Sequence, residues 1–254
     1  MTTGEIYDFI DSFAPFHSAM SFDNPGLLVG SRNTSVKTVL FALDITPDVV
    51  KEAKMIDAQL VISHHPVIFN PLKCLNRGSS PYLLAQYGID AICAHTNLDM
   101  SPKGVNVALA QCLHLKNVRT LSEYAPGLPE ALMGELTQEY TPASFAEQVK
   151  RDLNCDGLRY TDGHRTIRTV GLCSGGGADL LYIATKKGCE GFVTGESKHN
   201  LLIDAETLNL TLVDAGHFFT EDIVFPPLME LLHTQFPLLN CVKSKAMHSP
   251  AHYI

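Results

Sequence analysis

The sequence predicts an α/β protein built from two α/β halves whose central strands run mostly parallel. Short apolar runs alternate with stretches of helical periodicity along all 254 residues, which is the pattern of strand–helix–strand units. Histidines follow directly after several of the apolar runs. Hydrophobic residues make up 45% of the chain and charged residues 18%, so a buried core is expected and a disordered, collagenous or coiled-coil chain is excluded.

The first half is expected to open with a helix and to continue through three strands. Apolar residues at helical spacing predict a helix over 4–13, and a proline following a capping threonine at Thr46-Pro47 predicts another helix start. The remaining elements expected here are strands over 36–43, 60–63 and 89–94, a helix over 81–87, and a helix opened by Ser101-Pro102.

The second half repeats this rhythm. The expected elements are strands over 133–140, 167–173, 192–194 and 210–214, with a helix from Thr141-Pro142 to about residue 153. The cluster of Pro126, Gly127 and Pro129 is typical of a boundary between halves. We therefore divide the chain into halves 1–125 and 126–254, with the C-terminal segment free to pack back on the first half.

The two halves show a weak internal similarity at an offset of 131 residues. Residues 36–65 align without a gap on 167–196, and four positions are identical: Thr38/Thr169, Val39/Val170, Asp48/Asp179 and Ala53/Ala184. Both gene duplication and chance account for so few identities. If duplication holds, both sets of strand ends are expected to face one shared cleft.

Charge and cysteine usage limit the partners and the compartment. Nineteen basic residues against 27 acidic ones give a net charge of −8, so no nucleic-acid partner is expected. No apolar stretch reaches the ~18 residues that cross a bilayer, and the N-terminus lacks the features of a secretory signal. The seven cysteines are dispersed without a C-x-x-C pair, which favours free thiols and a cytoplasmic location.

The chemistry is expected where the strands end, because the binding crevice of an open α/β sheet lies at the carboxyl ends of its strands. Three of these ends carry histidine, and several offer carboxylates. The side chains placed there are Asp44, His64, His65, His95, Asp99, Glu196, His217 and Glu221, together with the turn Ser174-Gly175-Gly176-Gly177.

His64 and His65 leave one apolar strand together. Adjacent side chains on extended backbone point in opposite directions, so this pair is better suited to two separate metal ions than to one. Taken alone, the pair also fits two loop histidines without a ligand role.

Asp99, His217 and Glu221 complete the candidate ligand set. Asp99 precedes an expected helix start, where a short acid also serves as a cap. Glu221 lies four positions after His217, so one helical turn would align both side chains on one face. A surface carboxylate in a first helical turn would explain Glu221 without a metal, but not His217.

Five ligands are too many for one four-coordinate zinc with an open position, whereas they suit two divalent ions bridged by a carboxylate. A water shared by two ions has its pKa lowered toward ~7, which predicts hydrolysis without a protein nucleophile. Nitrogen and oxygen ligation is compatible with Zn, Fe, Mn, Co or Ni.

The glycine turn at 174–177 offers backbone N–H groups to an anion. It lacks the Lys-Ser/Thr sequence of a Walker loop, and a tight strand-to-helix turn explains it equally well. No serine in an elbow motif and no reactive cysteine stands out as a nucleophile.

These pieces resemble the GTP cyclohydrolase type-two homologue family, also called Nif-three-like proteins. The resemblance is carried by D-N-P-G-L-L-V-G at 23–30, S-H-H-P at 63–66, H-T-N-L-D at 95–99, the glycine turn, T-G-E at 194–196 and G-H-F-F-T-E at 216–221. It implies two α/β halves, a ring-like homo-oligomer such as a hexamer, and opening of the imidazole ring of GTP.

The resemblance also implies a site of two metal ions on His64, His65, Asp99, His217 and Glu221, with Glu221 bridging, and it places His95 and Glu196 nearby in the cleft. We therefore expect a metal-dependent hydrolase acting on a small nucleotide-like or heterocyclic molecule. The alternative is a non-enzymatic metal-binding or regulatory interaction protein. A third interpretation is an α/β protein with incidental histidines.

Overall fold

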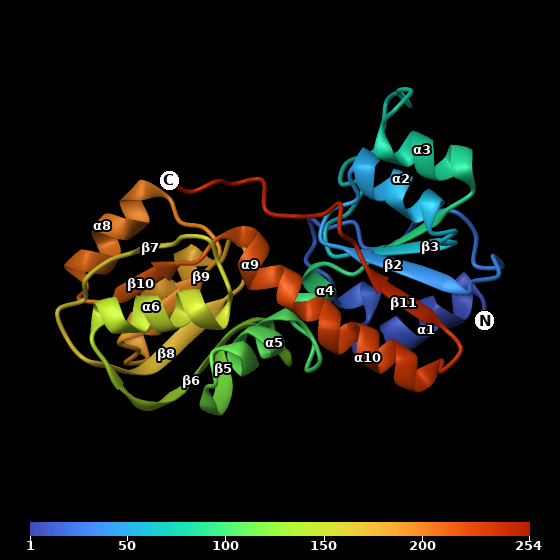
Figure 1. Cartoon of the computed structure of the whole chain (residues 1–254). Helices are drawn as coiled ribbons and strands as arrows, with labels where there is room; N and C mark the ends of the chain where they lie inside the picture. The colour runs from blue at the N-terminus through green and yellow to red at the C-terminus, as the bar shows by residue number, and fades with distance from the viewer. The chain divides into compact units, whose positions relative to one another are not determined.

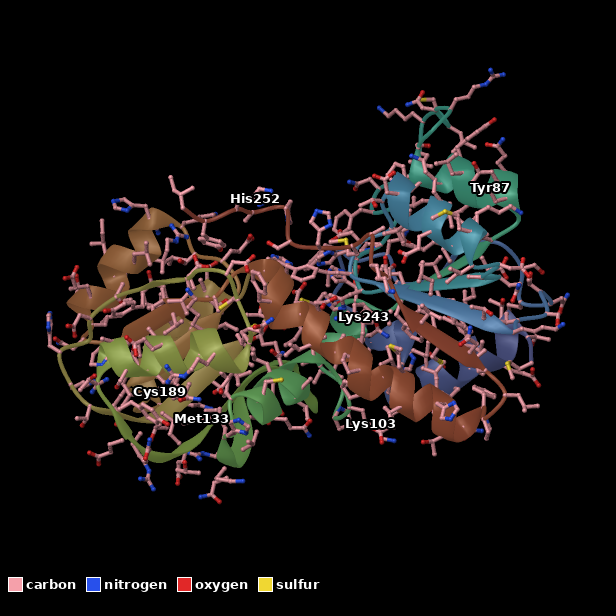
Figure 2. All side chains as sticks on the ribbon, in the orientation of Figure 1. Tyr87, Lys103, Met133, Cys189, Lys243 and His252 are labelled. Carbon is pink, nitrogen blue, oxygen red and sulfur yellow. The ribbon has the colours of Figure 1, made fainter.

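The computed structural model describes all residues from Met1 to Ile254 and divides into two compact units (Figure 1). Unit 1 comprises Met1–Lys103 and Phe225–His248, and unit 2 comprises Gly104–Val224 and Ser249–Ile254. The chain leaves unit 1 after Lys103, which is labelled in Figure 2, and later returns to it.

Unit 1 contains a five-stranded sheet in the order β1-β4-β3-β2-β11. The strands are β1 (Gly26–Val29), β2 (Thr38–Ala42), β3 (Leu60–Ser63), β4 (Asp90–Cys93) and β11 (Asn240–Lys243). All neighbours pair in parallel except the edge strand β1, which is antiparallel to β4. Every residue of β3 and β4 is buried, as is typical of parallel strands covered on both faces.

Helices cover both faces of this sheet (Figure 1). The helices of unit 1 are α1 (Thr3–Phe13), η1 (Phe16–Ser18), α2 (Pro47–Met55), α3 (Ser80–Tyr87), α4 (Thr96–Asp99) and α10 (Phe225–Gln235). Apolar residues of α2 and α3 pack together with residues of β2 and β3 in one core cluster. On the other side, the rings of Phe225 in α10 and Phe41 in β2 lie 6.2 Å apart.

Unit 2 contains a six-stranded sheet in the order β5-β6-β8-β9-β10-β7. The strands are β5 (Lys116–Ala125), β6 (Leu128–Tyr140), β7 (Arg159–Tyr160), β8 (Ile167–Cys173), β9 (Gly191–Thr194) and β10 (Thr211–Asp214). The central strands β8, β9 and β10 are parallel, whereas β5, β6 and β7 pair antiparallel.

The helices of unit 2 are α5 (Val105–Cys112), α6 (Pro142–Asp152), η2 (Ala178–Leu180), α7 (Leu181–Lys186), α8 (His199–Thr207), α9 (His217–Glu221) and η3 (Asp222–Val224). Two core clusters hold them to the sheet. One joins α5 and α6 to β8, and the other joins α7 and α8 to β9. None of the helices in either unit combines the length and apolar character needed to cross a bilayer.

The predicted α/β class with mostly parallel central strands is confirmed. The Pro126-Gly127 segment forms the turn of the β5–β6 hairpin. The compact units divide at 103/104, 224/225 and 248/249, whereas the predicted halves meet at 125/126. The expected helix at Ser101-Pro102 begins at Val105. The edge strands β1 and β7, the strand β5, and β11 were not among the predicted elements.

The two units share a local arrangement that supports the internal duplication. In unit 1, β2 pairs β3 with Val39 opposite Leu60, and in unit 2, β8 pairs β9 with Val170 opposite Gly191. Adding the offset of 131 to both residues of the first pair gives the residue numbers of the second pair, so the two strand pairs have the same register. In both units a third parallel strand follows, and a short antiparallel strand pairs with it at the edge.

Gly30→Ala is predicted to destabilise unit 1 far more than Gly88→Ala. Both glycines have positive φ, +105° and +66°, so alanine is strained at each. A Cβ on Gly30 would lie 1.9 Å from Oδ1 of the buried Asp90, whereas one on Gly88 would meet nothing within 4 Å. We expect a loss of roughly 3 kcal/mol for Gly30→Ala against about 1 kcal/mol for Gly88→Ala in urea unfolding. Equal losses would contradict this account.

Candidate metal centre

Every candidate ligand follows a parallel strand, as expected if the binding crevice lies at the carboxyl ends of the strands. In unit 1, β3 runs into His64 and His65, and β4 runs into His95 and the short helix α4, which ends at Asp99. In unit 2, β9 runs into Glu196, and β10 runs into α9, which begins at His217 and ends at Glu221. Each unit therefore carries its own group of imidazoles and carboxylates.

Three histidines of unit 1 form one cluster. One ring nitrogen from each of His64, His65 and His95 lies within 4.8 Å of the others. The ring centroids of His64 and His95 are 5.1 Å apart, and those of His65 and His95 are 5.5 Å apart. Three imidazoles at this spacing are an arrangement that nitrogen-preferring divalent metals bind.

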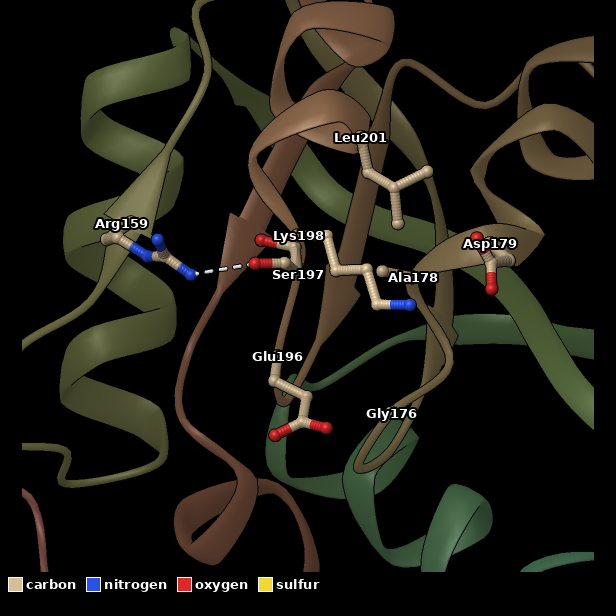
Figure 3. Close-up of a pocket in the computed structure, with 8 residues that line it drawn as sticks. All are labelled: Arg159, Gly176, Ala178, Asp179, Glu196, Ser197, Lys198 and Leu201. Atoms are coloured by element: carbon tan, nitrogen blue, oxygen red, sulfur yellow. Dashed lines mark hydrogen bonds between the residues drawn. The ribbon is translucent and has the colours of Figure 1, made fainter.

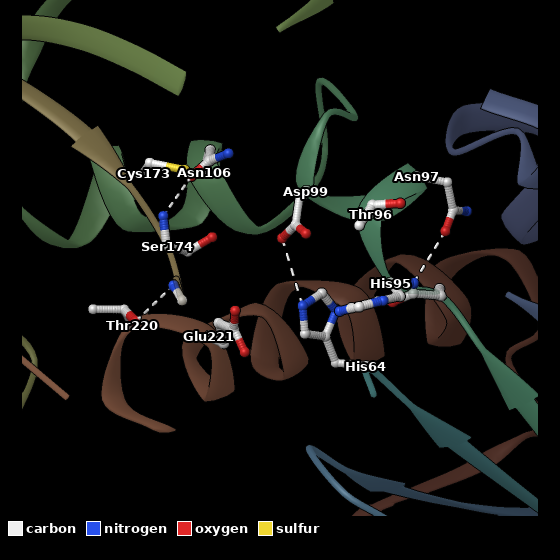
Figure 4. Close-up of polar contacts among 12 residues, drawn as sticks. His64, His95, Thr96, Asn97, Asp99, Asn106, Cys173, Ser174, Thr220 and Glu221 are labelled. Carbon is white, nitrogen blue, oxygen red and sulfur yellow. Dashed lines mark hydrogen bonds and ion pairs between the residues drawn. The ribbon is translucent and has the colours of Figure 1, made fainter. Parts of the chain in front are cut away.

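The tautomer of His64 is set by the backbone. His64 is fully buried, and its Nδ1 lies 2.9 Å from the carbonyl oxygen of Ala94. A carbonyl only accepts, so Nδ1 carries a proton, and in the neutral imidazole Nε2 keeps its lone pair. That Nε2 lies 3.5 Å from Oδ1 of Asp99 (Figure 4). Both atoms are donors of electron pairs, and they suit a shared cation.

Carboxylates orient the other two histidines in the same way. Nδ1 of His65 lies 2.9 Å from Oδ1 of Asp44, and Nδ1 of His95 lies 2.8 Å from Oδ1 of Asp23. An imidazole that donates one N–H to a carboxylate presents its other nitrogen as a ligand, which is the usual support of metal-binding histidines. All three histidines thus have Nδ1 engaged and Nε2 directed elsewhere.

Asp23 is the strongest of these supports. Its side chain is wholly buried, and it accepts hydrogen bonds from the hydroxyl of Thr96 at 2.6 Å and from the backbone N–H of Thr96 at 3.1 Å. Burial raises its pKa and is the largest single influence, but the hydrogen bonds from His95 and Thr96 and the charge of His95 together lower the pKa to about 2.

The sequence alone places Asp44 among the side chains at the strand ends, but it links neither Asp44 nor Asp23 to a histidine. Asp23 lies 72 residues from its partner His95, so no local pattern links them. A weak signal existed for Asp44, since it follows β2, the strand that pairs with β3, and β3 runs into His65.

The pair in unit 2 has the geometry that its spacing predicts. His217 and Glu221 occupy the two ends of α9, and His217 Nε2 lies 2.9 Å from Glu221 Oε2. The Glu221 side chain is only 5% exposed, and a buried carboxylate is stabilised by a neighbouring hydrogen-bond donor or cation. On the other ring nitrogen, His217 Nδ1 lies 3.5 Å from Oε2 of the exposed Glu196.

The glycine turn makes room for the Glu221 carboxylate. Gly175 has a φ of +56°, and a Cβ there would lie 2.1 Å from Glu221 Oε1. The N–H of Gly175 donates to the Thr220 hydroxyl at 3.2 Å, and the N–H of Ser174 donates to the side-chain oxygen of Asn106 at 2.9 Å (Figure 4). The tight turn therefore fixes the position of the segment that ends in Glu221.

The Cys93 thiol is not a metal ligand at the candidate site. Cys93 ends β4 near the histidines, but it is buried and its Sγ donates to the carbonyl oxygen of His64 at 3.0 Å. Burial, and then the charges of Asp23 and Asp99, raise the pKa of this thiol well above its usual value. Cys93 therefore stays protonated, which leaves imidazole nitrogen and carboxylate oxygen as the available donors.

Comparisons with known proteins agree with this fold. Residues 1–250 match the family described as Duf34/NIF3 (NGG1p interacting factor 3). A Clostridium acetobutylicum protein named "GTP cyclohydrolase 1 type 2 homolog" is 32% identical over 85% of this chain and 84% of its own length. One of the same name from Campylobacter jejuni is 30% identical over 87% of this chain and 88% of its own length. A crystal structure of a Staphylococcus aureus hypothetical protein superposes with a TM-score of 0.93 and 28% identity, and covers 100% of this chain and 99% of that one.

Asp23→Asn is predicted to destabilise unit 1 of chelator-treated protein by roughly 2 kcal/mol at pH 7. The pKa of Asp23 is depressed in the folded state, so its contribution is complete above its ordinary value of 3.8 and is lost as the pH falls through about 2. The difference between wild type and variant should therefore shrink over that interval in acid-dependent urea unfolding.

Asp48→Asn is the matched control for this measurement. The Asp48 side chain is 74% exposed beside Lys51, so its removal should leave the unfolding free energy nearly unchanged. A difference between wild type and Asp23→Asn that is constant from neutral to acid pH would show that Asp23 acts only through packing.

Proposed function

Because the chain belongs to the Duf34/NIF3 family, we propose that it is a metal-dependent hydrolase with two divalent ions per chain and a small nucleotide-like or heterocyclic substrate. One observation carries this proposal: the two ligand histidines of unit 1, His64 and His65, have Nδ1 held by a backbone carbonyl and a carboxylate, as metal-binding histidines do. The shared name of the curated relatives, "GTP cyclohydrolase 1 type 2 homolog", supports the substrate class.

The proposed ligands are His64, His65, Asp99, His217 and Glu221. We assign Glu221 as the bridging carboxylate, and His95 and Glu196 as neighbours that contact the ligands. Five such donors exceed what one tetrahedral zinc with an open position needs. The nitrogen and oxygen donor set suits Zn, Fe, Mn, Co or Ni.

A pair of divalent ions at this site would supply Lewis acidity and a water acidified toward a pKa of ~7. The carbonyl oxygen of Ala94 and the Asp44 carboxylate hold the ligand imidazoles of His64 and His65 in the binding tautomer, and Asp23 holds their neighbour His95 in place. Asp23 stays ionised across the physiological range because its pKa is about 2. No side-chain nucleophile is needed, and Cys93 is kept as a thiol.

We also propose that the protein is cytoplasmic and self-associates, as the family resemblance implies, with a hexameric ring as the expected assembly. All seven cysteines are free thiols, which supports a reducing compartment. Light scattering coupled to size-exclusion chromatography measures the mass of the assembly, and a monomeric mass contradicts the ring.

The second candidate function is a non-enzymatic metal-binding or regulatory interaction protein. The family description, an interacting factor, favours it. Under this function, a protein partner should co-purify in stoichiometric amount and be released by a chelator.

Metal analysis is the first test. We expect two equivalents of divalent metal per chain in the wild type, and substantially less in His64→Ala and in Glu221→Ala, because each substitution removes a ligand. His114→Ala is the control, since that side chain is 72% exposed and lies outside the site. Elemental analysis gives the metal content, and circular dichroism checks that the variants stay folded. A wild type without metal, or Glu221→Ala with full metal content, contradicts the assignment.

Turnover is the second test. We expect metal-loaded protein to hydrolyse at least one compound in a panel of nucleotides, phosphoesters and cyclic amides, and a chelator to abolish this turnover until metal is restored. Chromatography of the reaction products provides the measurement. If the metal content is intact and nothing in the panel is consumed, the hydrolase is refuted and the interaction protein is favoured.

A further inference from the structure

Unit 2 contains an open cavity of about 550 Å³ (Figure 3). Its walls include Gly176 from the glycine turn, Asp179 from η2, Glu196 and Lys198 from the loop after β9, and Leu201 from α8. A cavity of this size accommodates a small organic molecule such as a nucleoside.

The cavity adjoins the candidate metal ligands of the same unit. Glu196, on its wall, has its Oε2 3.5 Å from Nδ1 of His217. Gly176, also on the wall, follows Gly175, where a Cβ would touch the Glu221 carboxylate. A molecule bound in the cavity therefore lies next to His217 and Glu221.

One of the two cations of the cavity is already neutralised. The guanidinium of Arg159 is hydrogen-bonded to the nearly buried carboxylate of Asp214 and, at 3.0 Å, to the carbonyl oxygen of Ser197. Asp214 also accepts from the N–H and hydroxyl of Ser197, at 3.0 and 2.9 Å. This network braces the loop that carries Glu196 and Lys198.

The remaining charges are mixed and slightly negative. Lys198 contributes one positive charge, and Asp179 and Glu196 contribute one negative charge each, which gives 1 − 2 = −1. Figure 3 shows the Lys198 side chain extending into the cavity, with Asp179 and Glu196 on its walls. Such a cavity repels a polyphosphate but matches an uncharged group that offers both a hydrogen-bond donor and an acceptor.

We propose that this cavity recognises the amide edge of an uncharged nitrogen heterocycle, in which a ring N–H and a carbonyl oxygen are adjacent. Glu196 accepts the ring N–H, Lys198 donates to the ring carbonyl, and Leu201 packs against the ring. The inference rests on the proposed function and deepens it, because it identifies which part of the substrate is held beside the metal ligands.

Binding of inosine to metal-free protein tests the proposal, since inosine has this edge and carries no phosphate. We expect saturable binding in saturation-transfer difference NMR. 1-Methylinosine, which lacks the ring N–H, should bind at least about tenfold more weakly, because the Glu196 carboxylate is then left without its donor. Equal binding of the two nucleosides would overturn the proposal.

Two variants probe the cavity itself. Lys198→Met removes the donor and should weaken inosine binding about tenfold. Gly176→Val should abolish inosine binding, because the valine side chain would extend into the cavity and occupy the space of the ring. The substitution itself is tolerated, since a Cβ at position 176 would meet only Glu196 Oε1, at 3.5 Å. Lys186→Met is the matched control, since this exposed lysine of α7 is not on the cavity wall. Unchanged binding in Lys198→Met and Gly176→Val, or displacement of inosine by inorganic pyrophosphate, would refute the proposal.

Metal analysis of the same wild-type protein, made before its metal is removed for the binding measurement and again after reloading, separates this proposal from the proposed function. Two equivalents of metal with no inosine binding refute only the amide-edge cavity. Protein that cannot be loaded with metal refutes the hydrolase, whatever its affinity for inosine.

Discussion

The histidine cluster of unit 1 depends on one kind of interaction, a hydrogen bond from Nδ1 to an oxygen that can only accept. Ala94, Asp44 and Asp23 provide these oxygens for His64, His65 and His95. The bonds choose the tautomer and orient each ring in a cluster where one ring nitrogen from each histidine lies within 4.8 Å of the others. Without these bonds the rings would be held less firmly, and the entropy of ordering the ligand imidazoles would oppose metal binding.

In unit 2, glycines without a side chain are as important as these hydrogen bonds are in unit 1. Glu221 is buried at the end of α9, and its carboxylate occupies space that any Cβ at position 175 would need. The same glycine turn continues through Gly176 to the wall of the cavity. One backbone feature thereby serves both the candidate ligand and the candidate substrate pocket, and this explains a run of three glycines better than a tight turn alone.

The shared strand register suggests how two such different sites arose. The pairs β2–β3 and β8–β9 have the same register at the offset of 131 residues, so equivalent backbone positions exist in both units. At these positions unit 1 carries His64 and His65, while unit 2 carries Gly195 and Glu196. A common scaffold with different residues at its strand ends is consistent with duplication followed by specialisation, since loops at the strand ends vary without disturbing the buried sheet.

The sequence by itself determined the α/β class, the buried parallel strands and the residues at their carboxyl ends. These features follow from local periodicity and chain order, as the strand over 60–63 and the four-residue spacing of His217 and Glu221 show. Only the tertiary structure decided the short edge strands β1, β7 and β11, which are two to four residues long and depend on distant partners. It also decided that Asp23 supports His95 across 72 residues and that Lys198 and Glu196 share a cavity, because contacts between distant segments leave no periodic trace in the chain.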